Sequence, residues 1–124
     1  MISGEMMKEI IRNSYLENEN ILIVGYGKSG VKSSELAKRL GATVFVYDDN
    51  KDVEVNKEVV DKVYNNIEDI DFSNINIIVL SPGVPVESEI AQKSIKSGVE
   101  TIGEIEFGFR YSYRNNTCNN RNKW

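Results

Sequence analysis

The chain has 124 residues, 40% of them hydrophobic, which is enough apolar material for one core and predicts a single globular domain. No apolar run approaches the ~20 residues needed to cross a bilayer, and the first residues lack a signal peptide. We therefore expect a cytoplasmic protein with no membrane partner. The net charge is −4, but all 19 acidic residues precede residue 113, so residues 1–112 carry about −7, which argues against nucleic-acid binding.

Few side chains of the usual catalytic types are present. Histidine is absent, and the one cysteine, Cys118, cannot form an internal disulfide and has no neighbouring base, so we give it no role. We predict neither a metal site nor catalytic residues in this chain.

Hydrophobic periodicity predicts alternating helices and strands from the start of the chain. The apolar residues within 5–17 recur at close to helical spacing, which predicts a short leading helix. The apolar run 21–24 predicts a buried strand. Residues 31–40 are amphipathic and predict a helix that ends at Gly41. Its buried face is predicted to contain Ser33, Leu36, Ala37 and Leu40. The β-branched and aromatic run 43–48 predicts the second strand.

The same alternation continues after a weaker stretch. Within residues 50–75 we expect a polar helix at 56–61, a short strand at 62–64 and a turn or short helix at 67–72. Residues 76–80 predict an apolar strand. A helix capped by Ser88 and closed by Gly98 follows, then a strand at 99–102 and a strand end entering a short helix at 103–109. The helix is expected to turn Ile90, Ala91 and Ile95 to the core.

This order predicts an α/β fold: a Rossmann-like, doubly wound, mostly parallel sheet of about five strands with helices on both faces. Ligands bind such sheets beyond the carboxyl ends of the strands. Three stretches fall at those ends, namely residues 25–30, 48–50 and 81–85. We predict that they form one binding site.

The first stretch has the pattern G-x-G-x-x-G between an apolar strand and a helix. Its glycines, Gly25, Gly27 and Gly30, suit a sharp turn, a close backbone approach to pyrophosphate and close packing of helix on strand. The helix N-terminus then offers free N–H groups to an anion, and Lys28 and Ser29 lie where they could touch phosphate. A purely structural turn is the alternative, and Lys28 could equally be solvated.

The other two stretches have functional and structural interpretations as well. Asp48, which is followed by Asp49, ends the next strand and could contact a sugar or base, or only cap its own loop. Ser81, Pro82 and Gly83 could form the second wall of a phosphate site or a tight turn, because proline fixes φ and glycine permits close approach.

Four motifs in order resemble one family closely. They are I-V-G-Y-G-K-S-G at 23–30, V-Y-D at 46–48, L-S-P-G-V-P at 80–85 and I-G-E-I-E at 102–106. The chain is similar over about residues 6–112 to the N-terminal domain of the Mur ligases, in particular those that add D-glutamate. The glycine pattern is widespread, whereas S-P-G-[IV]-P followed by I-G-E-I-E is more distinctive.

The resemblance implies a domain that holds the UDP part of UDP-N-acetylmuramoyl-L-alanine in peptidoglycan precursor synthesis. Motif by motif, it places Lys28, Ser29 and Gly30 beside the diphosphate, Asp48 and Asp49 beside the uracil and ribose, and residues 81–83 across the diphosphate. In that family ATP and magnesium are the cofactors, and they belong to further ATP-binding and C-terminal domains, which we do not expect in this chain. We therefore expect this chain to need no cofactor, to bind substrate and to be inactive by itself.

Two alternatives stay open. The first is an NAD(H)-binding Rossmann domain of an oxidoreductase, with Asp48 on an adenosine ribose. The second is a sensor or assembly domain that binds no nucleotide.

Residues 113–124 lack apolar periodicity where the family pattern expects a strand entering an ATP loop, and we expect this tail to be disordered. One permitted set of codons for 114–124, read one base later, encodes Gly-Ile-Ile-Leu-Ala-Ile-Thr-Gly-Thr-Asn-Gly. That sequence is typical of a strand followed by a phosphate loop. We therefore hypothesise an out-of-frame tail, and the coding DNA tests this directly.

Overall fold

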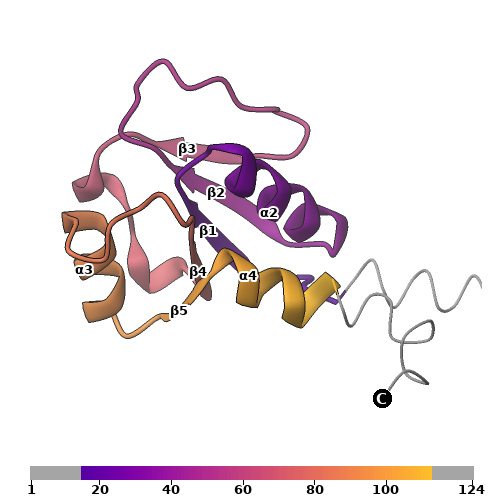
Figure 1. The fold of residues 1–124 in the computed structure, drawn as a ribbon. Helices are drawn as coiled ribbons and strands as arrows, with labels where there is room; N and C mark the ends of the chain where they lie inside the picture. Colours follow the sequence, from indigo (N-terminus) through magenta and orange to yellow (C-terminus); the bar gives the residue numbers. More distant parts are fainter. Residues whose placement is uncertain (1–14, 113–124) are drawn as a thin grey trace, which may run out of the picture.

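The computed structural model describes residues 15–112. Most of the predicted leading helix and the whole predicted tail, 113–124, lie outside the described residues. Within them, five strands form one parallel sheet in the order β3-β2-β1-β4-β5 (Figure 1). The strands are β1 (Asn20–Val24), β2 (Thr43–Tyr47), β3 (Lys62–Tyr64), β4 (Ile77–Leu80) and β5 (Glu100–Gly103). The predicted Rossmann-like α/β fold is confirmed.

Strand β1 lies at the centre of the sheet, paired with β2 on one side and β4 on the other. Residues 21–24 are at most 1% exposed, because helices or turns cover both faces of this strand. The chain winds outward from β1 in both directions, so the carboxyl ends of β1 and β4 lie side by side at one edge of the sheet. The strand order reverses between these two neighbours, which is where ligands bind in doubly wound sheets.

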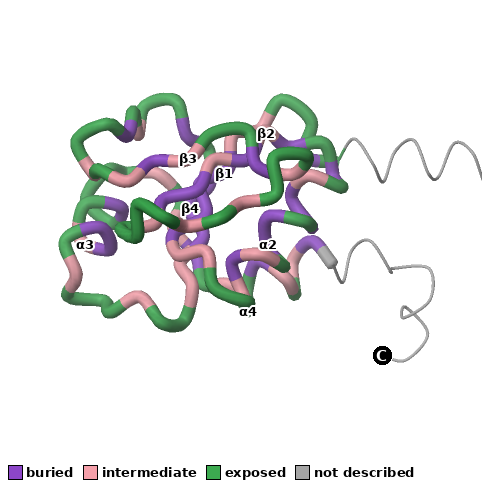
Figure 2. Tube along the Cα trace, turned by 90° about the horizontal axis from the view of Figure 1, so that it is seen from above, coloured by how far each residue is buried: buried purple, intermediate pink, exposed green. Residues whose placement is uncertain are grey.

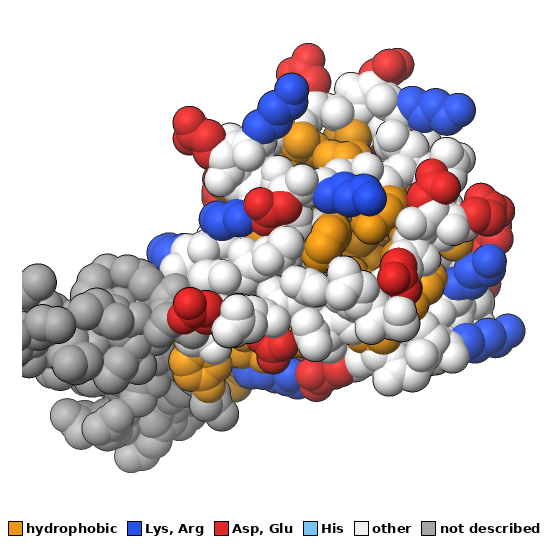
Figure 3. Space-filling view, turned by 180° about the vertical axis from the view of Figure 1, so that it is seen from behind, with side chains coloured by type: hydrophobic (Ala, Val, Ile, Leu, Met, Phe, Trp, Pro, Cys, Tyr) orange, Lys and Arg blue, Asp and Glu red, His pale blue; other side chains and the backbone are white. Residues whose placement is uncertain are grey.

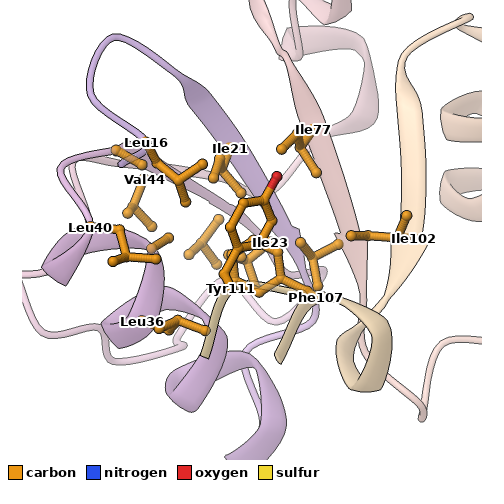
Figure 4. Packing of buried hydrophobic residues seen from close by; sticks show 14 of the residues in the cluster. Leu16, Ile21, Ile23, Leu36, Leu40, Val44, Ile77, Ile102, Phe107 and Tyr111 are labelled. Carbon is orange, nitrogen blue, oxygen red and sulfur yellow. The ribbon is translucent and has the colours of Figure 1, made fainter. Parts of the chain in front are cut away.

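One face of the sheet is covered by α2 (Lys28–Arg39) and α4 (Glu104–Phe107), which continues as a π-helical turn, Gly108–Ser112. Alternate strand residues such as Ile21, Ile23 and Ile77 point into this layer (Figure 4). The buried face predicted for the first long helix is confirmed, with Leu36, Ala37 and Leu40 at most 8% exposed. The ring of Phe107, fully buried, lies 5.0 Å from that of Tyr111, and closes the cluster at α4.

The opposite face is covered by α3 (Glu89–Lys96) and by two 3-10 turns, Ile67–Asp69 and Phe72–Asn74. The second hydrophobic cluster lies here and includes Leu22, Ile78 and Ile90. Ser88 caps α3 as predicted, its hydroxyl accepting a hydrogen bond from the N–H of Ala91 at 3.3 Å. Figure 2 shows the buried strands at the centre, with exposed loops around them.

Two expectations about these elements are wrong. Residues 56–61 form turns, not a helix. A single turn begins at Asn56, whose side-chain oxygen accepts from the N–H of Glu58 and whose carbonyl accepts from the N–H groups of Val59 and Val60. It does not continue, because the N–H of Asp61 donates to the carbonyl of Val44 in β2 at 2.8 Å. In α3, Ile95 is 52% exposed and Ser94 takes the buried position. The Ser94 hydroxyl donates to the carbonyl of Ile90 at 2.8 Å, so a small polar side chain is satisfied where α3 packs on β5.

The predicted strands and helices of the described residues otherwise occur with boundaries shifted by at most three residues. In the part of the chain from residue 15 to 112, no helix combines the length and hydropathy that crossing a membrane requires. The back of the molecule carries acidic and basic side chains interspersed with exposed hydrophobic ones (Figure 3).

Candidate functional site at the carboxyl edge of the sheet

The first glycine turn leaves β1 in a conformation that only glycine adopts easily. Gly25 has φ +90°, and its N–H donates to the carbonyl of Tyr47 at 2.8 Å, so the turn begins as a continuation of the sheet. A Cβ at Gly25 would lie 3.2 Å from both the Cβ of Ser81 and a methyl of Val84. The turn is therefore closely packed against the loop that follows β4.

Gly30 lets α2 approach this turn more closely than any other residue could. A Cβ at Gly30 would lie 2.0 Å from the carbonyl oxygen of Gly25, which is far inside van der Waals contact. Close packing of helix on strand, predicted for this glycine, is thus present. It places the first turn of α2 directly beyond the end of β1.

The N-terminus of α2 is open. Gly27 is the N-cap and offers no side-chain cap, and the first turn contains no acidic residue. The first hydrogen bond into the helix runs from the N–H of Val31 to the carbonyl of Gly27 at 2.9 Å, so the N–H groups of residues 28–30 precede it. A Cβ at Gly27 would meet nothing within 4 Å. Free N–H groups, the positive end of the helix dipole and open space together suit a bound anion.

Asp48, at the end of β2, reaches back to the glycine turn. One carboxylate oxygen accepts from the N–H of Tyr26 at 2.9 Å, and the other accepts from the N–H of Asn50 at 2.9 Å. The side chain of Asn65 donates to the carbonyls of Asp48 and Asn50, at 3.0 and 3.3 Å. The loop-capping role considered from the sequence is present, and it extends to the neighbouring turn.

Ser81 joins the glycine turn from the other side. Its hydroxyl donates to the carbonyl of Gly25 at 2.9 Å, and its carbonyl accepts from the N–H of Val84 at 3.0 Å. Residues 81–84 thus form a tight turn that also contacts the glycine turn. Pro82 and Gly83 are exposed on its outer side.

The electrostatic character of the edge changes from α2 to β2. Burial raises the pKa of Tyr47, and the nearby negative charges of Asp49, Glu89, Asp48 and Glu68 raise it further. Asp49 itself is exposed. The β2 side of the edge therefore favours hydrogen-bond donors, whereas the N-terminus of α2 favours acceptors with negative charge.

The structure brings the predicted residues together at one edge of the sheet. Gly25, Gly30, Asp48 and Ser81 are linked directly; Gly27, Lys28 and Ser29 lie on the open side of the same turn; Asp49, Pro82 and Gly83 lie in the flanking loops. Two further residues belong to the site. Tyr26 contributes its backbone N–H, which no sequence pattern indicates, and Asn65 contributes its side-chain amide, indicated only by its position after the short strand β3.

Two surface pockets formed by the described residues lie away from the candidate site. One, of about 290 Å³, lies between α2 and α4 and includes Ser33, Leu36 and Glu104. The other, of about 360 Å³, lies between α3 and the 3-10 turns and includes Ile70, Phe72 and Lys96. Neither contains any of the residues predicted for the site.

Fold and site together define a Rossmann-like α/β domain whose glycine turn, strand-end carboxylate and Ser-Pro-Gly turn meet at the switch point of the sheet. Residues 19–103 match the family model described as the Mur ligase MurD-like, N-terminal domain. The chain belongs to this family, as the motifs in its sequence predicted.

Curated relatives agree with this family. The chain is 33% identical over 104 residues to UDP-N-acetylmuramoylalanine–D-glutamate ligase from Caldicellulosiruptor saccharolyticus, covering 77% of this chain and 23% of the relative. It is 35% identical over 104 residues to the ligase of the same name from Staphylococcus aureus, covering 78% and 23%. The chain thus spans less than a quarter of the length of these relatives.

A solved structure of shikimate dehydrogenase from Aquifex aeolicus is similar with a TM-score of 0.47 and 15% identity, over 83% of this chain and 48% of that one. This likeness is too slight to bear on function.

Proposed function

We propose that this chain binds the UDP part of UDP-N-acetylmuramoylalanine, as the substrate-recognition domain of a D-glutamate-adding ligase in peptidoglycan synthesis. The observation that carries the proposal is the open N-terminus of α2. It has a glycine N-cap, no acidic residue in its first turn and unobstructed space beyond Gly27. A diphosphate fits such a site because backbone N–H groups and the helix dipole both favour negative charge.

The proposed ligand lies along the edge of the sheet. Its diphosphate contacts the N–H groups of residues 28–30 and the side chains of Lys28 and Ser29, with Ser81, Pro82 and Gly83 on its other side. Its nucleoside extends toward the end of β2, beside the loop of Asp48 and Asp49, where the exposed Asp49 makes the surroundings favourable for hydrogen-bond donors. Uracil and ribose both offer such donors, so the polarity of the edge matches the polarity of UDP.

Amide-bond formation is proposed for the whole ligase and not for these residues. The chain covers 22–23% of the length of the ligases it resembles, and ATP and magnesium are proposed to act in the remainder. Binding of the UDP-linked substrate is the part assigned to this chain.

Isothermal titration calorimetry with UDP, UMP and uridine tests the proposal. Affinity is expected to rise from uridine to UMP to UDP, because each added phosphate reaches more of the N–H groups at α2. Equal affinities for UDP and uridine would contradict a diphosphate site. Preferential binding of NADH, which UDP does not displace, would favour the oxidoreductase alternative, and binding of neither ligand would favour a nucleotide-free domain.

A matched pair of glycine variants locates the site. Gly27→Ala puts a methyl group into the open space at the N-cap and is expected to lower UDP affinity about tenfold or more, a loss of about 1.4 kcal/mol. Gly108→Ala is the control, since Gly108 is helical, with φ −61° and ψ −45°, and a Cβ there also meets nothing within 4 Å. Its UDP affinity should equal that of the wild type.

A further inference from the structure

The peptide unit between Gly25 and Tyr26 is held at both of its polar atoms. Its N–H, which belongs to Tyr26, donates to the carboxylate of Asp48 at 2.9 Å. Its C=O, which belongs to Gly25, accepts from the hydroxyl of Ser81 at 2.9 Å. Asp48 follows β2 and Ser81 follows β4, the two strands that flank β1. The neighbouring strands therefore fix the plane of this peptide from opposite sides.

Without these bonds the peptide would have freedom to rotate. Gly25 has φ +90° and no side chain, so its own backbone restricts the turn weakly. The carbonyl oxygen of Gly25 also forms the surface on which Gly30 packs, 2.0 Å from the position of an added Cβ. A change in the orientation of this peptide would therefore move the contact that sets where α2 begins.

The charge of Asp48 makes a purely direct role at an anion site unfavourable. A carboxylate near a diphosphate repels it, and both oxygens of Asp48 already accept backbone N–H groups, from Tyr26 and Asn50. A bond from an N–H to a carboxylate is stronger than one to a neutral acceptor. The negative charge of Asp48 therefore strengthens its hydrogen bond to the N–H of Tyr26 and so stabilises the glycine turn.

We infer that Asp48 and Ser81 are positioning residues that act as one unit, fixing the Gly25–Tyr26 peptide so that the N-terminus of α2 is aimed at the diphosphate. This inference rests on the proposed UDP site and deepens it. Asp48 then contributes to recognition of the diphosphate through the turn, and the loss of either side chain releases the same peptide.

Calorimetry with inorganic pyrophosphate, which lacks uracil and ribose, tests the inference beside UDP. In Asp48→Asn the affinities for pyrophosphate and UDP are expected to fall by the same factor, about tenfold, as expected for a lost hydrogen bond to a charged group. Ser81→Ala should lower both as well, and the double variant should lose less than the product of the two single losses. Asp71→Asn with Ser73→Ala is the matched control, because this aspartate–serine pair lies in the 3-10 turn Phe72–Asn74 and its neighbour, on the other covered face. It should change neither affinity.

Three outcomes of the calorimetry would overturn the inference. A fall for UDP with unchanged pyrophosphate binding would mean that Asp48 contacts the nucleoside. A rise in pyrophosphate affinity in Asp48→Asn would mean that its charge only repels the ligand. Losses that multiply in the double variant would mean that the two side chains act independently.

The amide resonance of Tyr26 supplies a readout that needs no ligand. In the free protein its hydrogen exchange should become faster in Asp48→Asn and also in Ser81→Ala, whereas the control pair should leave it unchanged. An unaltered Tyr26 amide in either single variant would overturn the inference even if the wild type binds neither UDP nor pyrophosphate. A wild-type protein that binds neither UDP nor pyrophosphate would, by contrast, contradict the proposed function.

Discussion

Gly30 shows at the scale of a residue how little room the candidate site leaves for change. Its α-carbon lies against the carbonyl of Gly25, and the two nearest atoms that an added methyl group would meet, the carbonyl oxygen and carbon of Gly25, are backbone atoms. Backbone cannot move aside as the end of a flexible side chain can. The third glycine of the pattern is therefore required by packing, whatever ligand the turn binds.

Gly30→Ala is expected to lower the free energy of unfolding by about 1–3 kcal/mol, because the new Cβ overpacks the contact between α2 and the turn. Urea denaturation followed by circular dichroism measures this loss. Gly83→Ala is the control, since Gly83 has open space around its α-carbon and is not in the left-handed region. Its stability should stay within about 0.5 kcal/mol of wild type. Equal effects of the two substitutions would refute the packing account.

Helix α3 shows at the scale of an element how packing distance selects the buried face. The helix lies against β5, where the small side chain of Ser94 is fully buried and Ile95 remains half exposed. Periodicity alone grouped Ile95 with Ile90 and Ala91, because isoleucine is the more hydrophobic residue. In the structure, the position of β5 buries Ser94 and leaves Ile95 exposed.

A matched pair of substitutions in α3 tests this arrangement. Ile90→Ala is expected to destabilise the protein by about 2–5 kcal/mol, because Ile90 is 7% exposed and packs in the second cluster. Ile95→Ala, on the same helix, should cost no more than about 0.5 kcal/mol. Thermal or urea unfolding of both variants provides the comparison. A loss at Ile95 as large as that at Ile90 would show that α3 is rotated in solution.

At the scale of the whole molecule, Asp61 ties three separate segments together. Its carboxylate accepts from the Nζ of Lys38 in α2 at 2.6 Å and from the N–H of Val44 in β2 at 2.8 Å. Its own N–H donates to the carbonyl of Val44 at 2.8 Å, just before β3 begins. Partial burial of Asp61 alone would raise the pKa of its carboxyl group, but the hydrogen bonds from Lys38 and Val44, with the charge of Lys38, lower that pKa below 3.8.

This lowered pKa predicts how stability depends on pH. The folded state holds the charged carboxylate more strongly than the unfolded state does, so the contribution of Asp61 is fully present above 3.8. It is lost as the pH falls through the lower, folded-state pKa. Wild type should therefore be more stable than Asp61→Asn at neutral pH, and the gap should narrow progressively below pH 3.8. Urea unfolding of both proteins as a function of pH measures the gap, and a constant gap at every pH would contradict the assignment.

Local patterns were enough to predict most elements and where the candidate site lies. The apolar runs of β1 and β4, the cap at Ser88 and the glycine after α2 act through interactions within a few residues, so they can be recognised in one dimension. The parallel, doubly wound sheet followed as well, because strands alternating with helices are joined by right-handed crossovers. The helix expected at 56–61, by contrast, stops after one turn, because the N–H of Asp61 bonds to the carbonyl of Val44 in the distant strand β2.

The chain's amino-acid sequence by itself determined the parallel fold, the family and the three stretches at one edge of the sheet. Tertiary structure alone decided what Asp48 and Ser81 hold, because their common partner, the Gly25–Tyr26 peptide, lies 22 and 56 positions away along the chain. Hydrogen bonds between backbone and distant side chains leave no periodic trace in a sequence. Only the packing of β2 and β4 on either side of β1 brings these groups within bonding distance.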